Sequence, residues 1–144
     1  GSASDGMKDS VRNIEVTGEF VCNLATWDTR EKMNKSSTTL PPESDEIVLS
    51  GLTAIPSEIV SAPRIKEAPV HLECRYLKSV DIPGWNEKDA YRVIFGEVVG
   101  IHIKDEFITE EGLVDVIKML AIGRLGYGDY TRVDSESIFS MNRP

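Results

Sequence analysis

The sequence is poor in the residues that build disulfide frameworks and metal centres, with two cysteines and two histidines among 144 residues. Cys22 and Cys74 lie among apolar neighbours, and their spacing fits neither a zinc motif nor a redox motif. The chain is long enough to enclose a core without disulfides. We therefore expect no metal site and interpret the cysteines as buried, reduced thiols of a cytoplasmic protein.

Basic residues are also in short supply, because 16 Lys and Arg stand against 24 Asp and Glu and give a formal net charge of −8. A nucleic-acid or anionic membrane surface needs a basic stripe, so neither partner is expected. No apolar run reaches the length of a membrane span, and no signal peptide opens the sequence. An acidic protein can still bind one phosphate through the backbone dipoles of a helix N-terminus.

The beginning of the chain predicts a helix followed by a strand. Residues 4–10 are small and polar, and a helical pattern follows that Asp9 or Ser10 can cap. Gly18 is a plausible end for this helix. The apolar run over 19–24 then predicts a strand.

The next part of the chain leaves the predicted core. A helix with a polar face is expected over 27–36, capped by Thr26 or Asp28. Residues 36–63 are rich in Ser, Thr and Pro and hold one short apolar turn that Gly51 can end. Because long connections in compact domains are often lids or binding loops, we interpret 36–63 as a long excursion within the domain.

The second half of the chain is rich in predicted strands. Residues 70–77 alternate between apolar and polar, and 91–103 form a longer apolar run with internal glycines that permit bulges or curvature. A turn is expected at 83–86, a short helix at 114–120 and a last strand at 138–141. These elements indicate an α+β fold built on an antiparallel barrel, although the visible strands are few for a closed barrel.

Several segments resemble the FMN-binding split-barrel, flavin reductase-like family in the same order along the chain. The run from Ser4 to Ile14 resembles the loop-to-helix segment of that family. Further matching pieces are 18–24, 33–34, 51–53, 62–65, 68–74, 96–103 and 124–130. Each piece alone is weakly specific, but together they cover nearly the whole chain in register.

The resemblance implies a single flavin reductase-like, FMN-binding split-barrel domain over 1–144 with flanking helices. Family members normally have several dozen residues before the first helix, including strands that cradle the flavin ring. The sequence therefore resembles the C-terminal two thirds of a typical member, with the N-terminal strands missing.

The resemblance places the FMN phosphate at the start of the chain. A helix N-terminus offers free N–H groups and a partial positive charge, hydroxyls add donors, glycine permits close approach and lysine supplies a charge. The predicted phosphate-binding residues are Ser2, Ser4, Gly6, Lys8 and Ser10. Asp9 would repel a phosphate, so it is assigned to the helix cap. Read from the residues alone, the same segment is an ordinary capped helix with a solvated lysine.

A second candidate cofactor-binding segment lies near the C-terminal end of the matched pieces. Glycines flank Tyr127 and would let the loop approach a planar ligand, on which Tyr127 and Tyr130 could stack beside Arg124. The alternative is a terminal strand whose aromatic residues complete the core. His71 and His102 sit at strand positions and are interpreted as structural histidines rather than catalytic acids.

The resemblance implies an FMN-dependent oxidoreductase that takes a hydride from NAD(P)H, with a monooxygenase component as a further partner. Such chemistry resides in the cofactor, so no catalytic side chain is assigned. The family generally forms homodimers, and we expect one here, since uncovered strand edges and apolar faces are unstable alone. The alternative is a non-catalytic flavin-binding or protein-interaction module.

Overall fold

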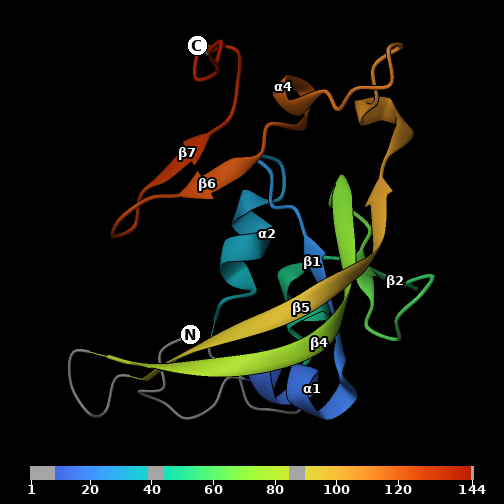
Figure 1. Cartoon of the computed structure of the whole chain (residues 1–144), viewed down its shortest axis with the longest axis vertical. Coiled ribbons are helices and arrows are strands. Elements are labelled where there is room, and N and C mark those ends of the chain that lie inside the picture. Colours follow the sequence, from blue (N-terminus) through green and yellow to red (C-terminus); the bar gives the residue numbers. More distant parts are fainter. Residues whose placement is uncertain (1–8, 39–43, 85–89, 144) are drawn as a thin grey trace. The chain divides into compact units, whose positions relative to one another are not determined.

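A computed structural model describes residues 9–38, 44–84 and 90–143 of the chain. The chain forms two compact units that are discontinuous in sequence (Figure 1). Unit 1 comprises 1–22, 55–64 and 72–101, and unit 2 comprises 23–54, 65–71 and 102–144. The expectation of one domain over 1–144 stays a prediction.

Unit 1 begins with the helix and strand that the sequence predicts. Helix α1 (Asp9–Thr17) ends at Gly18, whose φ of 73° lies in the left-handed region and whose N–H donates to the carbonyl of Ile14. Glycine adopts this conformation without steric cost, which explains why the helix stops there. Strand β1 (Glu19–Asn23) follows at once, so both local predictions are confirmed.

Strand β1 forms a three-stranded sheet with the two longest strands of the described chain, β4 (Val70–Pro83) and β5 (Ala90–Ile103). The order is β1-β4-β5, so β4 pairs with both of the others. The two strands predicted from residues 70–77 and 91–103 are confirmed, and the first extends further than predicted. A Cβ added at Gly96 would lie 2.5 Å from the ring of Phe20, and one at Gly100 would lie 2.8 Å from Ile59. These glycines let side chains from elsewhere in unit 1 lie directly on β5.

An ionic cluster fastens α1 to these strands. Arg92 on β5 donates to both oxygens of Asp81, at 2.6 and 2.9 Å, and also pairs with Glu15 of α1 at 3.1 Å. Glu15 in turn accepts a hydrogen bond from Ser79 on β4. The hydrogen bonds from Arg92 hold the pKa of Asp81 below its ordinary value. Three elements of unit 1 are therefore tied by one half-buried guanidinium.

A buried carboxylate holds the loop that precedes β3. Glu73 of β4 is fully buried, and its two oxygens accept hydrogen bonds from the backbone N–H groups of Glu58, Ile59 and Val60 at 2.9, 2.7 and 2.9 Å. The loop lies between β2 (Ala54–Ile55) and β3 (Arg64–Ile65), which pair with each other. The carboxylate of Glu73 therefore accepts the hydrogen bonds of three backbone N–H groups that lie outside helices and strands.

Unit 2 contains the helices α2 (Arg30–Lys35) and α3 (Glu46–Ser50). The predicted start of α2 near residue 27 and its capping by Thr26 or Asp28 are wrong. Instead, the buried Thr26 and Thr29 are bonded through their hydroxyls and backbone, which closes a turn before the helix begins. The short helical turn ended by Gly51 is confirmed, because Gly51 caps α3 with a φ of 75°.

The rest of unit 2 consists of short elements. They are the 3₁₀ helix η1 (Asp105–Phe107), helix α4 (Val116–Met119), and the antiparallel strands β6 (Ile122–Arg124) and β7 (Tyr130–Arg132). The strand predicted at 138–141 is wrong, since these residues form no regular structure and Phe139 and Met141 are exposed. Strand β6 pairs instead with β7, which precedes residues 138–141 in the chain.

The two cysteines differ in their exposure. Cys74 is buried as expected, and burial raises its pKa, but Cys22 is exposed, so the prediction of two buried thiols is wrong for Cys22. Cys22 lies on β1, an edge strand of its sheet.

Within the predicted excursion over 36–63, the structure describes α3 and β2, while 39–43 lie outside the described residues. Among the described helices, none is long and apolar enough to cross a membrane.

Replacing Glu73 by glutamine tests the role of its carboxylate. The amide keeps the volume of the side chain but removes its charge and sets an NH₂ group against backbone donors, so we expect the free energy of unfolding to fall by about 3 kcal/mol. Urea unfolding followed by circular dichroism measures the change. Glu97→Gln, at an exposed position on β5, is the matched control. Equal stabilities for the two variants would contradict this role.

Candidate functional site

Of the predicted phosphate-binding segment, the structure describes only the C-terminal end, residues 9 and 10. Ser2, Ser4, Gly6 and Lys8 lie outside the described residues. Ser10 is the second residue of α1. Asp9 is the first residue of α1, and its carboxylate accepts from Arg12 at 2.7 Å. This carboxylate therefore has a cationic partner within the first turn, where acidic residues favour a helix.

A pocket of about 480 Å³ lies beside α1 within unit 1. We call it the α1 pocket. Its walls are residues of α1, of β1 and the turn before it, and of the loop that leads to β3: Ser10, Asn13, Ile14, Thr17, Glu19, Phe20, Val21, Ser61, Ala62 and Pro63. One side thus offers hydroxyl and amide groups of the helix, and another offers apolar side chains of β1. Such a mixture of polar and apolar walls is typical of a small-molecule site.

The acidic group in the wall of the α1 pocket is engaged within the protein. Glu19 accepts hydrogen bonds from the backbone N–H of Ser61 at 2.7 Å and from its hydroxyl at 2.5 Å. These bonds to Ser61 lower the pKa of Glu19 below its ordinary value of 4.5. The contact ties the loop 61–63 to β1 and so fixes two walls of the pocket in relation to each other.

The second predicted segment forms the hairpin between β6 and β7, in unit 2. Arg124 stands opposite Tyr130, and its guanidinium donates to the carbonyl of Tyr127 across the turn. Tyr127 is 98% exposed and has a φ of 59°. Tyr130 lines a pocket. Tyr130 thus lines a cavity in unit 2, while Arg124 supports the turn and Tyr127 projects from its tip.

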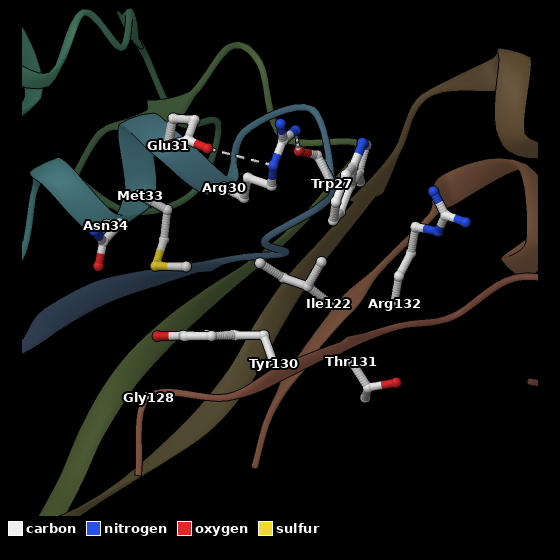
Figure 2. A pocket seen from close by; sticks show the side chains of 10 residues that line it. All are labelled: Trp27, Arg30, Glu31, Met33, Asn34, Ile122, Gly128, Tyr130, Thr131 and Arg132. Carbon is white, nitrogen blue, oxygen red and sulfur yellow. Dashed lines mark hydrogen bonds and ion pairs between the residues drawn. The ribbon is translucent and has the colours of Figure 1, made fainter. Parts of the chain in front are cut away.

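The cavity that Tyr130 lines has a volume of about 280 Å³ and lies between α2 and the hairpin (Figure 2). We call it the Trp27 pocket. Its lining residues are Trp27, Arg30, Glu31, Met33, Asn34, Ile122, Gly128, Tyr130, Thr131 and Arg132. The indole of Trp27 stands between two guanidiniums, with that of Arg30 3.9 Å and that of Arg132 5.1 Å from the ring. Both distances are in the range of cation–π contacts.

Sequence reasoning missed most of the Trp27 pocket. A tryptophan followed three residues later by an arginine near a helix start is a signal that could have indicated the first pair, since such residues meet on one face. The approach of Arg132 depends on the backbone pairing of Thr26 with Ala121 and of β6 with β7. No local pattern reports that contact.

The histidines lie together in unit 2. His71 is buried, and its Nε2–H donates to the carbonyl of Ile65 at 2.8 Å. The ring of His102 packs edge-on against it, with centroids 6.3 Å apart. The burial of His71 and its bond to the backbone agree with the structural interpretation, which stays a prediction. Among the described residues, no three His, Cys, Asp or Glu side chains converge on a possible metal site.

Antiparallel sheets with few short helices match the flavin reductase-like class of split-barrel proteins. Residues 3–121 match the family described as the flavin reductase like domain. The chain belongs to this family, and the predicted α+β split-barrel fold is confirmed.

Three similar proteins support this assignment. An uncharacterised protein of Halalkalibacterium halodurans is 34% identical over the whole of this chain and 68% of its own length. Nitrilotriacetate monooxygenase component B from Bacillus cereus is 29% identical, with a TM-score of 0.85 over 96% of this chain and 67% of that one. A split-barrel protein from Shewanella frigidimarina, 18% identical, shows the fold alone, with a TM-score of 0.77 over 92% of this chain and 65% of that one. The chain spans about two thirds of each relative.

The Glu19–Ser61 contact predicts a dependence of stability on pH. Because the pKa of Glu19 in the folded protein lies below 4.5, its contribution is fully present above that value and is lost as the pH falls through the lower folded-state pKa. We expect the stability difference between the wild type and Glu19→Gln to be constant near neutral pH and to shrink in acid. Urea unfolding at a series of pH values measures it.

Glu97→Gln serves again as the control, because Glu97 is exposed on β5. Its difference from the wild type should vary less with pH. If the Glu19→Gln difference also stayed constant down to about pH 3, where a glutamate of the unfolded chain is protonated, the contact with Ser61 would not stabilise the fold.

Proposed function

We propose that this chain binds FMN and acts as a flavin reductase, passing a hydride from NAD(P)H to the flavin. The observation that carries the proposal is the family match over residues 3–121, which includes the N-terminal loop and the α1 pocket. Similarity to a monooxygenase component B extends the proposal to a monooxygenase partner.

The residues of the α1 pocket suit the polar part of FMN. A phosphate is favoured at the beginning of α1 by the free N–H groups and the positive end of the helix dipole. In the proposal, Ser10 donates its hydroxyl to the phosphate together with Ser2, Ser4, Gly6 and Lys8. Asn13 and Thr17, which also line the pocket, are suited to hydrogen-bond the hydroxylated chain.

The side chains of this protein have positioning tasks in the proposed reaction. Bound flavin supplies the centre that accepts the hydride, so the protein binds, orients and excludes water. Phe20 and Val21 provide the apolar wall of the α1 pocket. Arg124, Tyr127 and Tyr130 are proposed to contact the cofactor in the assembled protein. The ring of Tyr127 is almost fully exposed in this chain and is therefore accessible to such a ligand.

A homodimer is part of the proposal. Large apolar side chains are exposed along β4 and β5, among them Leu77 (60%), Phe95 (44%) and Ile101 (64%). Exposed apolar side chains mark an interaction face in many proteins when they form a contiguous patch. Pairing of two copies would cover such a face and lower its cost in water.

A negative charge introduced at position 10 tests the proposed phosphate site. Ser10→Asp leaves the start of α1 favourable for a helix but repels a phosphate, so we expect FMN affinity to fall at least about tenfold. Riboflavin, which lacks the phosphate, should bind the variant and the wild type equally. Quenching of flavin fluorescence measures both affinities. Ser135→Asp, at an exposed position, is the charge-matched control, and an equal loss with riboflavin would argue against a phosphate site at Ser10.

Turnover separates an enzyme from a non-catalytic flavin-binding or interaction module. Purified protein with added FMN should oxidise NADH or NADPH faster than free FMN does, as measured by loss of nicotinamide absorbance. Flavin binding without such acceleration would favour the non-catalytic alternative. Failure to bind FMN at all would contradict the proposed function of this chain.

A further inference from the structure

The Trp27 pocket presents two arginines that have unused donors. Arg30 bonds to the carbonyl of Trp27 through Nη1 and lies 3.5 Å from Glu31 through Nε. Arg132 bonds to Asp134 through Nε and Nη2 at 3.0 and 2.8 Å. Each guanidinium has five N–H donors. Within the part of the chain that the structure describes, Nη2 of Arg30 and Nη1 of Arg132 have no protein partner.

The arginines are also held in place before any ligand arrives. Arg30 is held by its stacking on Trp27 and its bond to the Trp27 carbonyl, and Arg132 by its two bonds to Asp134, while their side chains remain 37% and 42% exposed. A fixed and accessible guanidinium loses little side-chain entropy when it binds an anion. Planar, bidentate geometry makes phosphate and carboxylate its preferred partners.

The other wall of the same pocket is apolar and aromatic. Figure 2 shows the ring of Tyr130 facing Met33 and Ile122, with the amide of Asn34 at one end. An aromatic ring can stack on tyrosine and contact a methionine sulfur. An amide can donate to and accept from the edge of a heterocycle. Gly128, at the rim, would have open space around an added Cβ, so it does not obstruct the entrance.

The size of the pocket limits its ligand. A volume of about 280 Å³ lies at the lower end of the range of roughly 300–1,000 Å³ that is usual for ligand sites. It suits one ring system with an attached sugar phosphate rather than a whole dinucleotide. A ring for the apolar wall and a phosphate for the arginines describe a heterocycle that carries a sugar phosphate.

We infer that the Trp27 pocket binds the adenosine-phosphate end of the nicotinamide nucleotide, and that Arg30 and Arg132 favour the 2′-phosphorylated form. The inference rests on the proposed function for the identity of the co-substrate. Pairing of an arginine with the 2′-phosphate is the interaction by which proteins distinguish NADP from NAD. Two guanidiniums beside one indole supply it here, and the site thereby selects NADPH over NADH.

Direct binding of fragments tests the inference without flavin or turnover. Calorimetric titration with 2′,5′-ADP and with 5′-AMP compares ligands that differ in the 2′-phosphate. We expect 2′,5′-ADP to bind at least about tenfold more tightly, because charge-assisted bonds of this kind exceed a neutral hydrogen bond. No binding of either fragment overturns the whole inference, and equal affinities overturn the preference for a 2′-phosphate.

Variants assign the effect to the pocket. Arg132→Gln and Arg30→Gln should each remove most of the advantage of 2′,5′-ADP while leaving the affinity for 5′-AMP closer to that of the wild type. Lys35→Gln, at an exposed position on α2 outside the pocket lining, removes the same charge and should change neither affinity. An equal loss in Lys35→Gln would mean that the effect is general electrostatics, which overturns the site.

A third variant separates binding from folding. Arg132→Lys keeps the charge but loses the planar fork, so it should retain the fold and still weaken 2′,5′-ADP. Wild-type affinity in this variant would overturn the role of Arg132. Protein that binds 2′,5′-ADP but shows no FMN-dependent turnover would keep the pocket assignment and lose the proposed function. Turnover with no fragment binding would do the reverse.

Discussion

The side chain of Glu73 is withdrawn from water, and the loop ahead of β3 takes its shape from that carboxylate. Burying a carboxylate is costly unless hydrogen bonds replace its hydration. Three successive backbone N–H groups, those of residues 58–60, donate to it. The same bonds satisfy donors that no strand or helix would satisfy. Without the carboxylate, the three N–H groups would lose their partner in unit 1, and without the N–H groups the carboxylate would be buried with its hydration unreplaced.

The consequences of this contact extend to the α1 pocket. Once residues 58–60 are fixed, Ser61 follows directly in the chain and meets Glu19 on β1. Residues 61–63 then form one wall of the pocket beside Ser10. Gly100 completes the arrangement, because a side chain there would collide with Ile59 in the same loop. The proposed cofactor site therefore depends on a structural acid that does not line it.

Local signals in the sequence predicted the elements that local interactions decide. Gly18 and Gly51 end α1 and α3 in left-handed conformations, and the alternating pattern after residue 70 gives β4. The start of α2 was wrong because paired threonines close a turn ahead of it, a tertiary detail that helix propensity does not report. The strand expected near the C-terminus was wrong because apolar residues there find no pairing partner among the described strands.

The two candidate sites also differ in how far local sequence features mark their residues. Ser10 at the start of a helix is a local feature, and the family resemblance makes it a predicted phosphate ligand, whereas the Trp27 pocket is assembled by backbone pairing between residues distant in sequence. Nothing in the sequence pattern marks its two arginines, Arg30 and Arg132, as members of one site. The family resemblance pointed to Tyr130 but not to the guanidiniums that share its pocket. Long-range contacts of this kind need coordinates.

The tip of the β6–β7 hairpin has a conformational cost that glycine would avoid. Tyr127 lies in the left-handed region with φ of 59°, between two glycines and in full contact with water. For a residue with a Cβ, that conformation costs about 1 kcal/mol. The phenol contributes no burial within this chain to offset the cost. The chain therefore displays an accessible aromatic ring, and a tyrosine-selective chemical label would attach there without disturbing the core.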